Sequence, residues 1–226
     1  MSSDESTSSP LSNRTTVRRG AKRAEYGVSQ MKEILGAGTV AHVAVNTDDG
    51  PLVLPMIYGI SEDTMYLHGA LANSLLKEGA ENQVCATVTI VDGLVIAKTP
   101  FNHSMNYRSV VVRGQARVVA DVQETLHALQ VMTDHIVPTW DVTRPLSDSE
   151  IRATRVIALP LTEMSAKIRN EGAMNVPEDA DAPFWAGHIP LTTVFGEPVA
   201  NEDAAGPIPQ SVASLPGRDA HRFPRN

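Results

Sequence analysis

Cysteine, aromatic residues and positive charge are all scarce in this chain of 226 residues. The single cysteine, Cys85, excludes an intramolecular disulfide and a cysteine-rich metal cluster. The net charge is -7, from 19 Lys and Arg against 26 Asp and Glu, which argues against binding to nucleic-acid phosphates. No apolar run approaches the roughly 20 residues of a membrane-spanning helix, and no hydrophobic leader is present. We therefore expect no nucleic-acid partner, no membrane partner and, by default, a cytoplasmic location.

Several signatures of catalysis and metal binding are also missing. The chain has no glycine-rich phosphate loop, no GxSxG elbow and no Rossmann glycine fingerprint, which disfavours ATP-type and α/β-hydrolase chemistry. No close pair of carboxylates ends an apolar strand, so glycosidase chemistry has no support. None of the seven histidines are paired at i, i+4, and His127 and His135 are too far apart to chelate one ion. The sequence predicts no metal site.

The 42% of hydrophobic residues is enough to form a core, and the pattern divides the chain into three parts. Residues 1–25 are rich in Ser and Thr and then basic, without hydrophobic periodicity, which predicts a flexible basic arm. Residues 198–226 are rich in Pro and small residues, which predicts a disordered tail. The folded domain is expected to cover 26–197.

Apolar residues in this domain mostly alternate with period two, which is typical of an antiparallel sheet or barrel. The first three predicted strands form a meander, and the next two form a hairpin around Asp92-Gly93. Strands of this kind close most economically as a barrel, because closure removes exposed edges. We therefore predict a mainly β fold, a six- to seven-stranded antiparallel barrel with short peripheral helices. The predicted strands cover 39–46, 51–60, 64–69, 83–91, 94–98, 107–120 and 155–168.

Short helices are predicted between these strands from their caps and apolar faces. Ser29 is expected to cap the first, with Met31, Ile34 and Leu35 on its buried face. Asn73 is expected to cap the second. Asp121, with Glu124 three residues later, begins a third helix. The buried face of this third helix is predicted to consist of Val122, Leu126, Leu129 and Ile136.

Two histidines lie where binding chemistry is plausible. His68 ends a predicted strand just before the helix start at Asn73-Ser74, where backbone N–H groups can meet an anion. His103 lies with Arg108 in an unusually polar segment between two apolar strands. For either histidine, a hydrogen-bonded structural imidazole is the alternative. Lys167 and Arg169 are either solvated strand ends or further contacts for an anion.

The ordered set of short motifs resembles the pyridoxamine 5′-phosphate oxidase-like, FMN-binding split-barrel superfamily. Within it, the chain is most similar to the flavin-nucleotide-binding branch that includes nitroimidazole-resistance proteins. The resemblance spans about 18–197. The segments that carry it are 22–26, 51–55, 65–70, 87–94, 103–110, 165–169 and 185–187, the most specific being His103-Ser-Met-Asn-Tyr-Arg-Ser-Val110.

The resemblance implies a homodimeric split barrel with one FMN per subunit near the dimer interface. It places the flavin ring along the strand that contains Val53, Leu54, Pro55 and Met56, and the phosphate at 68–74. Further family positions lie close to the cofactor. The cofactor-binding residues it implies are Val53, Leu54, Pro55, Met56, His68, Asn73, Ser74, Tyr107, Arg108, Ser109, Lys167 and Trp185.

The function implied is an FMN-dependent oxidoreductase acting on an unidentified small molecule, with a nicotinamide as one candidate electron donor. His68 is the candidate catalytic residue, as an acid or base or by positioning. Relatives usually have Ser followed by Arg or Lys where this chain has Asn73-Ser74, so Arg108, Lys77 or the basic arm would have to replace that cation. The alternatives are a non-catalytic flavin-binding protein, a deazaflavin in the same pocket, or a haem protein with His68 or His103 as axial ligand.

Overall fold

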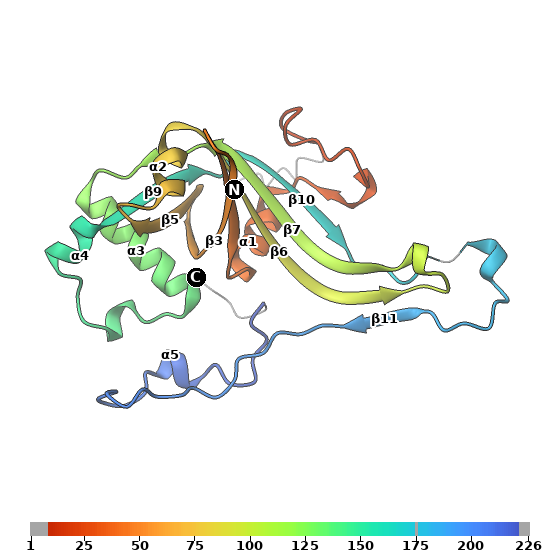
Figure 1. The fold of residues 1–226 in the computed structure, drawn as a ribbon. Helices are drawn as coiled ribbons and strands as arrows, with labels where there is room; N and C mark the ends of the chain where they lie inside the picture. The colour runs from red at the N-terminus through yellow and green to blue at the C-terminus, as the bar shows by residue number, and fades with distance from the viewer. Residues whose placement is uncertain (1–8, 175, 222–226) are drawn as a thin grey trace, which may run out of the picture.

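The computed structural model describes residues 9–174 and 176–221, which form two antiparallel sheets with short helices around them (Figure 1). The larger sheet has the strand order β1-β10-β7-β6-β2-β3, with β11 paired to β6, and the smaller has the order β4-β5-β9-β8. The predicted mainly β, antiparallel split barrel is confirmed. The strands are β1 (Ala24–Glu25), β2 (Ala41–Thr47), β3 (Gly50–Met56), β4 (Tyr58–Ser61), β5 (Thr64–Ala70), β6 (Gln83–Ile96), β7 (Ser104–Gln115), β8 (Arg117–Val118), β9 (Thr154–Pro160), β10 (Glu163–Arg169) and β11 (Gly187–Pro190).

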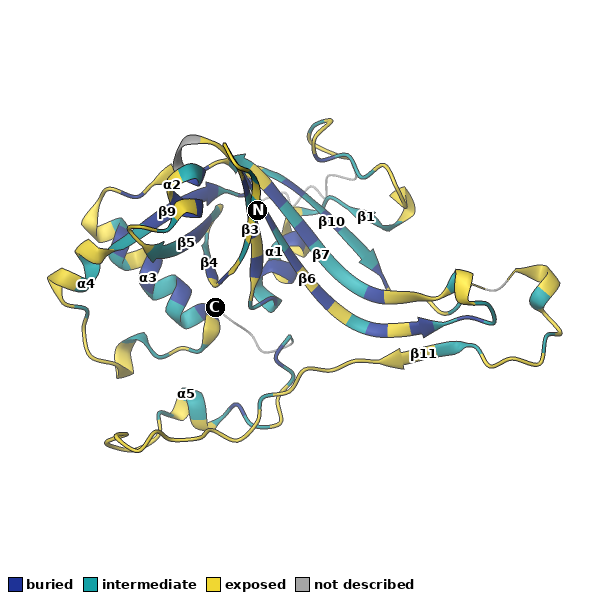
Figure 2. Ribbon diagram, viewed as in Figure 1, coloured by how far each residue is buried: buried dark blue, intermediate teal, exposed yellow. Residues whose placement is uncertain are grey.

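Two apolar clusters hold the sheets and helices together (Figure 2). The larger fills the barrel with alternate side chains of both sheets and the buried faces of α1 and α2. The smaller lies between the second sheet and α3. The helices are α1 (Val28–Ala37), α2 (Ser74–Glu81), α3 (Val122–Ile136), α4 (Asp148–Ala153) and α5 (Gln210–Ala213), with 3-10 turns η1 (Ala21–Arg23), η2 (Pro100–Asn102), η3 (Trp140–Val142) and η4 (Pro177–Asp179).

Two of the predicted strands are each divided between the two sheets. The predicted strand 51–60 becomes β3, which pairs with β2, and β4, which pairs with β5. The predicted strand 155–168 likewise becomes β9 and β10. The three-stranded meander is therefore wrong. Alternation along a sequence shows which side chains face one way, but a bend that moves the chain to another sheet leaves this alternation intact.

The predicted hairpin around Asp92-Gly93 is also wrong, because β6 continues through it. The register with β7 shifts between Val91 and Gly93, which is a β-bulge and not a turn. Arg108 binds the Asp92 side chain, and β11 lies so close that a Cβ on Gly93 would be 2.8 Å from the Ile189 carbonyl oxygen. The turn between β2 and β3 is at Gly50, whose φ is 112°.

Two of the three predicted helix caps are confirmed, and so is the predicted buried face of α1, which consists of Met31, Ile34 and Leu35. Asn73 and Asp121 accept hydrogen bonds from the backbone N–H groups of Leu76 and Glu124, as predicted. The Ser29 cap is wrong, since α1 begins after Gly27.

The buried face of α3 is also different from the predicted one, although Leu129 is buried. Val122 and Ile136 are exposed, and the helix packs on the second sheet instead through Thr125, Ala128, Met132 and His135. The physical reason is its close approach to β4: a Cβ on Gly59 would lie 2.7 Å from the Met132 backbone nitrogen.

Both ends of the described chain contact the barrel. In the predicted basic arm Thr15 is buried, and Arg14 forms an ion pair with Glu163. In the predicted tail, α5 follows a long extended segment, and the ring nitrogen Nδ1 of His221 lies 3.0 Å from the Ala37 carbonyl oxygen. Residues 1–8 and 222–226 of the arm and tail lie outside the described residues, and the three-part division of the chain stays a prediction. No helix in the described ranges is long and apolar enough to cross a bilayer.

Candidate functional site

The outer face of the larger sheet contains one group of the predicted binding residues. Lys167 of β10 is paired in register with Ser109 of β7, and Tyr107 lies two residues away on the same face. Their neighbours Val110, Val112 and Ala166 point the other way, into the barrel core. The structure therefore brings Tyr107, Ser109 and Lys167 together on one outer surface.

The predicted flavin-ring segment is on β3, three strands from β7 and four from β10 in the same sheet. Alternation exposes Val53 and Pro55 on the outer face, whereas Leu54 and Met56 pack into the core. Among the described strands β3 pairs with β2 alone, so its second edge has unpaired backbone groups. A planar amphipathic ring could hydrogen-bond to such an edge.

His68 of β5 faces α3 and not the barrel interior. Its Nδ1 atom lies 3.3 Å from the thioether sulfur of buried Met132, and Nε2 has no hydrogen-bond partner among the described residues. Burial lowers the pKa of His68 below its usual 6.5, so the imidazole is neutral at pH 7. A neutral imidazole with an available nitrogen can accept a proton or bind a metal centre.

This pKa shift predicts a pH dependence of stability. The unfolded state binds more protons than the folded state between the folded pKa and 6.5, so the stability from neutral His68 is complete above pH 6.5 and is lost as the pH falls through the folded pKa. We expect the unfolding free energy of wild type to fall more steeply between pH ~7 and ~5 than that of His68→Gln. Urea unfolding at several pH values measures both slopes, and parallel slopes would contradict the prediction.

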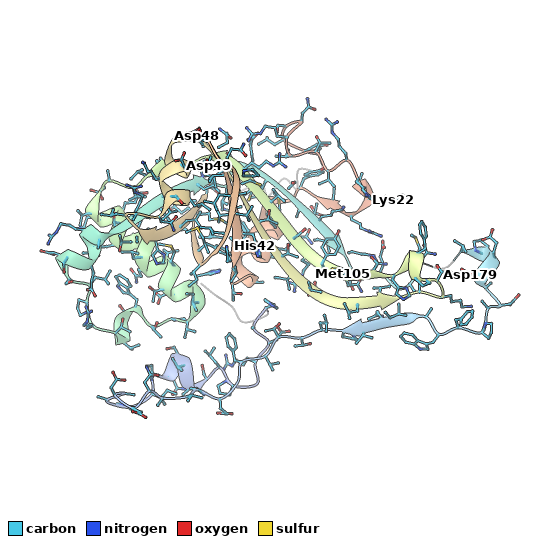
Figure 3. All side chains as sticks on the ribbon, viewed as in Figure 1. Lys22, His42, Asp48, Asp49, Met105 and Asp179 are labelled. Atoms are coloured by element: carbon cyan, nitrogen blue, oxygen red, sulfur yellow. The ribbon has the colours of Figure 1, made fainter. Side chains whose placement is uncertain are left out.

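The predicted phosphate site after His68 has a helix start but no cation. Asn73 Oδ1 is occupied as the cap of α2. A pocket of about 450 Å³ beside Ser74 is lined by Asp48, Asp49 and Glu78, and Figure 3 shows the two aspartates at the β2–β3 turn. The negative charges of these three carboxylates would repel a phosphate at this position.

Arg108 lies about midway along the long β6–β7 hairpin, in a different environment from Tyr107 and Ser109. Its Nε and Nη2 atoms donate to the two carboxylate oxygens of Asp92 at 2.9 and 2.7 Å. The hydrogen bonds that Arg108 donates to Asp92 raise the pKa of Arg108, and burial opposes this rise only in part. Asn106, Arg169 and His188 line the same cavity. Sequence reasoning missed this group because Asp92 was interpreted as a turn residue.

The remaining predicted residues lie on the projecting hairpin. Trp185 is 64% exposed just before β11, which pairs with the outer half of β6 (Figure 1). His103 is exposed near the hairpin tip, with its Nδ1 atom 3.0 Å from the Thr99 carbonyl oxygen. Within one chain, the structure does not bring Trp185 or His103 to β3 or to His68. Among the described residues, no three His, Cys, Asp or Glu side chains are close enough to hold a metal ion.

Solved structures with the same fold extend over nearly the whole chain. The flavocytochrome Anf3 from Azotobacter vinelandii is 32% identical, with a TM-score of 0.87 over 91% of this chain and 98% of its own. The FAD and heme binding protein from Mycobacterium smegmatis is 30% identical, with a TM-score of 0.83 over 90% of this chain and 100% of its own. A protein from Bacteroides thetaiotaomicron described as a 5-nitroimidazole antibiotic resistance protein is 25% identical, with a TM-score of 0.55 over 64% of this chain and 86% of its own.

Family comparison gives the same assignment. No curated protein sequence matches the chain. The family model described as Pyridoxamine 5'-phosphate oxidase matches residues 28–168, from the start of α1 almost to the end of β10. The chain therefore belongs to the pyridoxamine 5′-phosphate oxidase-like, FMN-binding split-barrel superfamily.

Proposed function

We propose that this protein binds a flavin nucleotide and uses it for redox chemistry on a small molecule. The observation that carries the proposal is the unpaired edge of β3 beside exposed Val53 and Ile57. The backbone C=O groups of this edge, and the N–H groups of its residues other than Pro51 and Pro55, match the polar edge of an isoalloxazine ring. The apolar side chains match its face. The bound flavin would supply hydride or electron transfer, while the protein would orient it and exclude water.

The names of two of the matched structures support a flavin but do not determine whether it is FMN or FAD. Sequence motifs favour FMN, whereas the Mycobacterium smegmatis protein is named for FAD. The carboxylates beside Ser74 make the start of α2 a weak phosphate site, so the flavin phosphate is not well matched there. The ring therefore contributes more to the proposed binding than the phosphate does at this position.

A second function, haem binding, is favoured by the environment of His68. Its neutral imidazole, with Nε2 available, has the properties of an axial ligand, and the neighbouring apolar cluster around Met132 suits a porphyrin better than the exposed surroundings of His103. The Azotobacter vinelandii protein is named a flavocytochrome, and the Mycobacterium smegmatis protein is named an FAD and heme binding protein. His68 would thus hold haem, or would act as acid or base toward a substrate of the flavin.

A second copy of the chain is the proposed partner. Large apolar side chains are exposed from the barrel along the β6–β7 hairpin to the segment after β11, and contiguous exposed apolar patches mark interaction sites. A homodimer would cover them, and would let Trp185 of one subunit approach the β3 edge of the other. The exposed side chains are Val53, Ile57, Val91, Leu94, Met105, Ile189 and Leu191.

An absorption spectrum of the purified protein, followed by mass identification of the released chromophores, tests these proposals together. We expect a flavin spectrum that bleaches on reduction, and a haem band if His68 is a ligand. Titration of the flavin-free protein with riboflavin should give an affinity within about ten-fold of that for FMN if the ring dominates. A colourless protein that binds neither flavin would remove the proposed function.

A further inference from the structure

The end of β10 lies against the middle of the β6–β7 hairpin (Figure 1). A polar cavity of about 340 Å³ is lined by residues of these strands. Its walls come from β6, β7, β10 and β11, and none of the flavin contacts proposed above requires it. Its polar residues are Asp92, Asn106, Arg108, Arg169, Asn170 and His188.

Arg108 is held in this cavity with part of its donor set unused. Asp92 takes the side of the guanidinium formed by Nε and Nη2. Nη1 has no hydrogen-bond partner among the described residues, so the end formed by Nη1 and Nη2 is open to a second oxyanion. Because a guanidinium has five N–H donors in a fixed plane, one carboxylate orients it without exhausting it.

The β-bulge between Val91 and Gly93 accounts for this arrangement. It changes the register of β6 at the residue whose carboxylate holds Arg108. Bulges re-aim side chains and occur frequently beside functional sites. Asp92 therefore acts as a positioning residue for the guanidinium.

Two buried residues form a rigid wall beside Arg108. Arg169 is 3% exposed and donates from Nη1 to Asn106 Oδ1 and from Nη2 to the Gly172 carbonyl oxygen. Its Nε atom has no hydrogen bond and lies 3.7 Å from a carboxylate oxygen of Glu171. Asn106 is 4% exposed. The hydrogen bonds of Arg169 to Asn106 and Gly172 fix the shape of this wall, and Glu171 offsets part of its positive charge.

We propose that this cavity binds an oxyanion, a phosphate or a carboxylate, through the open end of Arg108 with His188 as a second contact. Of the cavity-lining side chains, two carry a permanent positive charge and one, Asp92, a negative charge. The balance favours an anion over a cation, in contrast to the acidic pocket beside Ser74. The volume is ample for a phosphate or carboxylate group.

Asp219 of the C-terminal segment limits the affinity. It is close enough to act on Arg108 by charge, yet among the described residues Asp92 is the one carboxylate within ion-pair distance. Its carboxylate accepts a hydrogen bond from the His221 backbone N–H. An oxyanion would experience repulsion from Asp219, so Asp219→Asn is expected to strengthen binding several-fold.

Calorimetric titration with inorganic phosphate and pyrophosphate tests the proposal, using the full chain with and without bound flavin. Arg108→Gln should weaken binding of the better probe by roughly ten- to hundred-fold. Arg117→Gln is the control, because Arg117 also donates two hydrogen bonds to one carboxylate, that of Glu124, but lies outside the cavity. This variant should leave binding unchanged. His188→Ala, at an exposed position, is expected to fold normally and to weaken binding less than Arg108→Gln.

Two sources of the oxyanion give different results. If it is the phosphate of the flavin, Arg108→Gln weakens FMN but not riboflavin. If it belongs to a separate substrate, Arg108→Gln leaves both flavin affinities unchanged and weakens the probe on flavin-loaded protein. Equal probe and FMN affinities in wild type, Arg108→Gln and His188→Ala would overturn the proposal. The inference does not depend on the proposed function, since the flavin-free titration decides it even if no flavin binds.

Discussion

The His68→Ala variant should fail to form the haem band that haem-titrated wild type forms. Its Nε2 atom is the available ligand in the apolar surroundings of α3, while Nδ1 faces Met132. Replacing even an outer-shell partner of a metal ligand typically costs about 10–100-fold in affinity, so loss of the ligand itself should cost at least ~100-fold. Haem titration followed by absorption spectroscopy measures this directly.

His103→Ala is the control for this result, because His103 is exposed and lies on the distal hairpin. It should retain the haem band. A band that persists in His68→Ala and disappears in His103→Ala would reassign the ligand. Absence of any band in wild type would remove haem binding and leave His68 as the candidate acid or base.

The Gly59→Ala variant should be destabilised by about 1–3 kcal/mol, or should fail to fold. An added Cβ would lie 2.7 Å from the Met132 nitrogen, 2.8 Å from its Cα and 2.8 Å from the Val131 carbonyl carbon. All three are backbone atoms of α3, so no side-chain rotation relieves the clash. Urea unfolding measures the loss, and displacement of α3 would also move Met132 away from His68.

Gly36→Ala is the matched control within the same chain. Gly36 lies inside α1, and an added Cβ would meet no atom within 4 Å. Alanine has a higher helix propensity than glycine, so this variant should be more stable than wild type by up to ~1 kcal/mol. Equal stability of Gly59→Ala and wild type would show that α3 packs less closely on β4 than the structure indicates.

The helix caps show how far local chemistry carries a prediction. Asn73 and Asp121 each accept a hydrogen bond from the backbone N–H three residues further on, which depends on neighbours in the chain alone. The buried face of α3 depends instead on which helix side meets Gly59 of β4. The helical periodicity of apolar residues does not contain that information. It places Val122 and Ile136 on the buried face, whereas both are exposed.

The candidate site residues also divide into those that local motifs predict and those that only tertiary contacts bring together. The motif order indicated the family, and it placed Tyr107, Ser109 and Lys167 in short segments that the sheet register brings together. The sequence does not predict the cavity around Arg108, because Asp92 and His188 are far apart in the chain and come together only when β11 pairs with β6. The dipeptide Asp92-Gly93 is typical of a turn, but in the structure Asp92 lies within β6 and forms an ion pair with Arg108.

The sequence by itself determined the antiparallel β class, the starts of most helices, the family and the lack of a cation at Asn73-Ser74. Those features follow from alternation, capping chemistry and short motifs, which are local properties of the chain. Only the tertiary structure decided which strands change sheets, which side of α3 is buried, and that Arg108 is held by Asp92 with one end open. These depend on hydrogen bonds and packing between distant segments, and no residue pattern within a single segment specifies its partner.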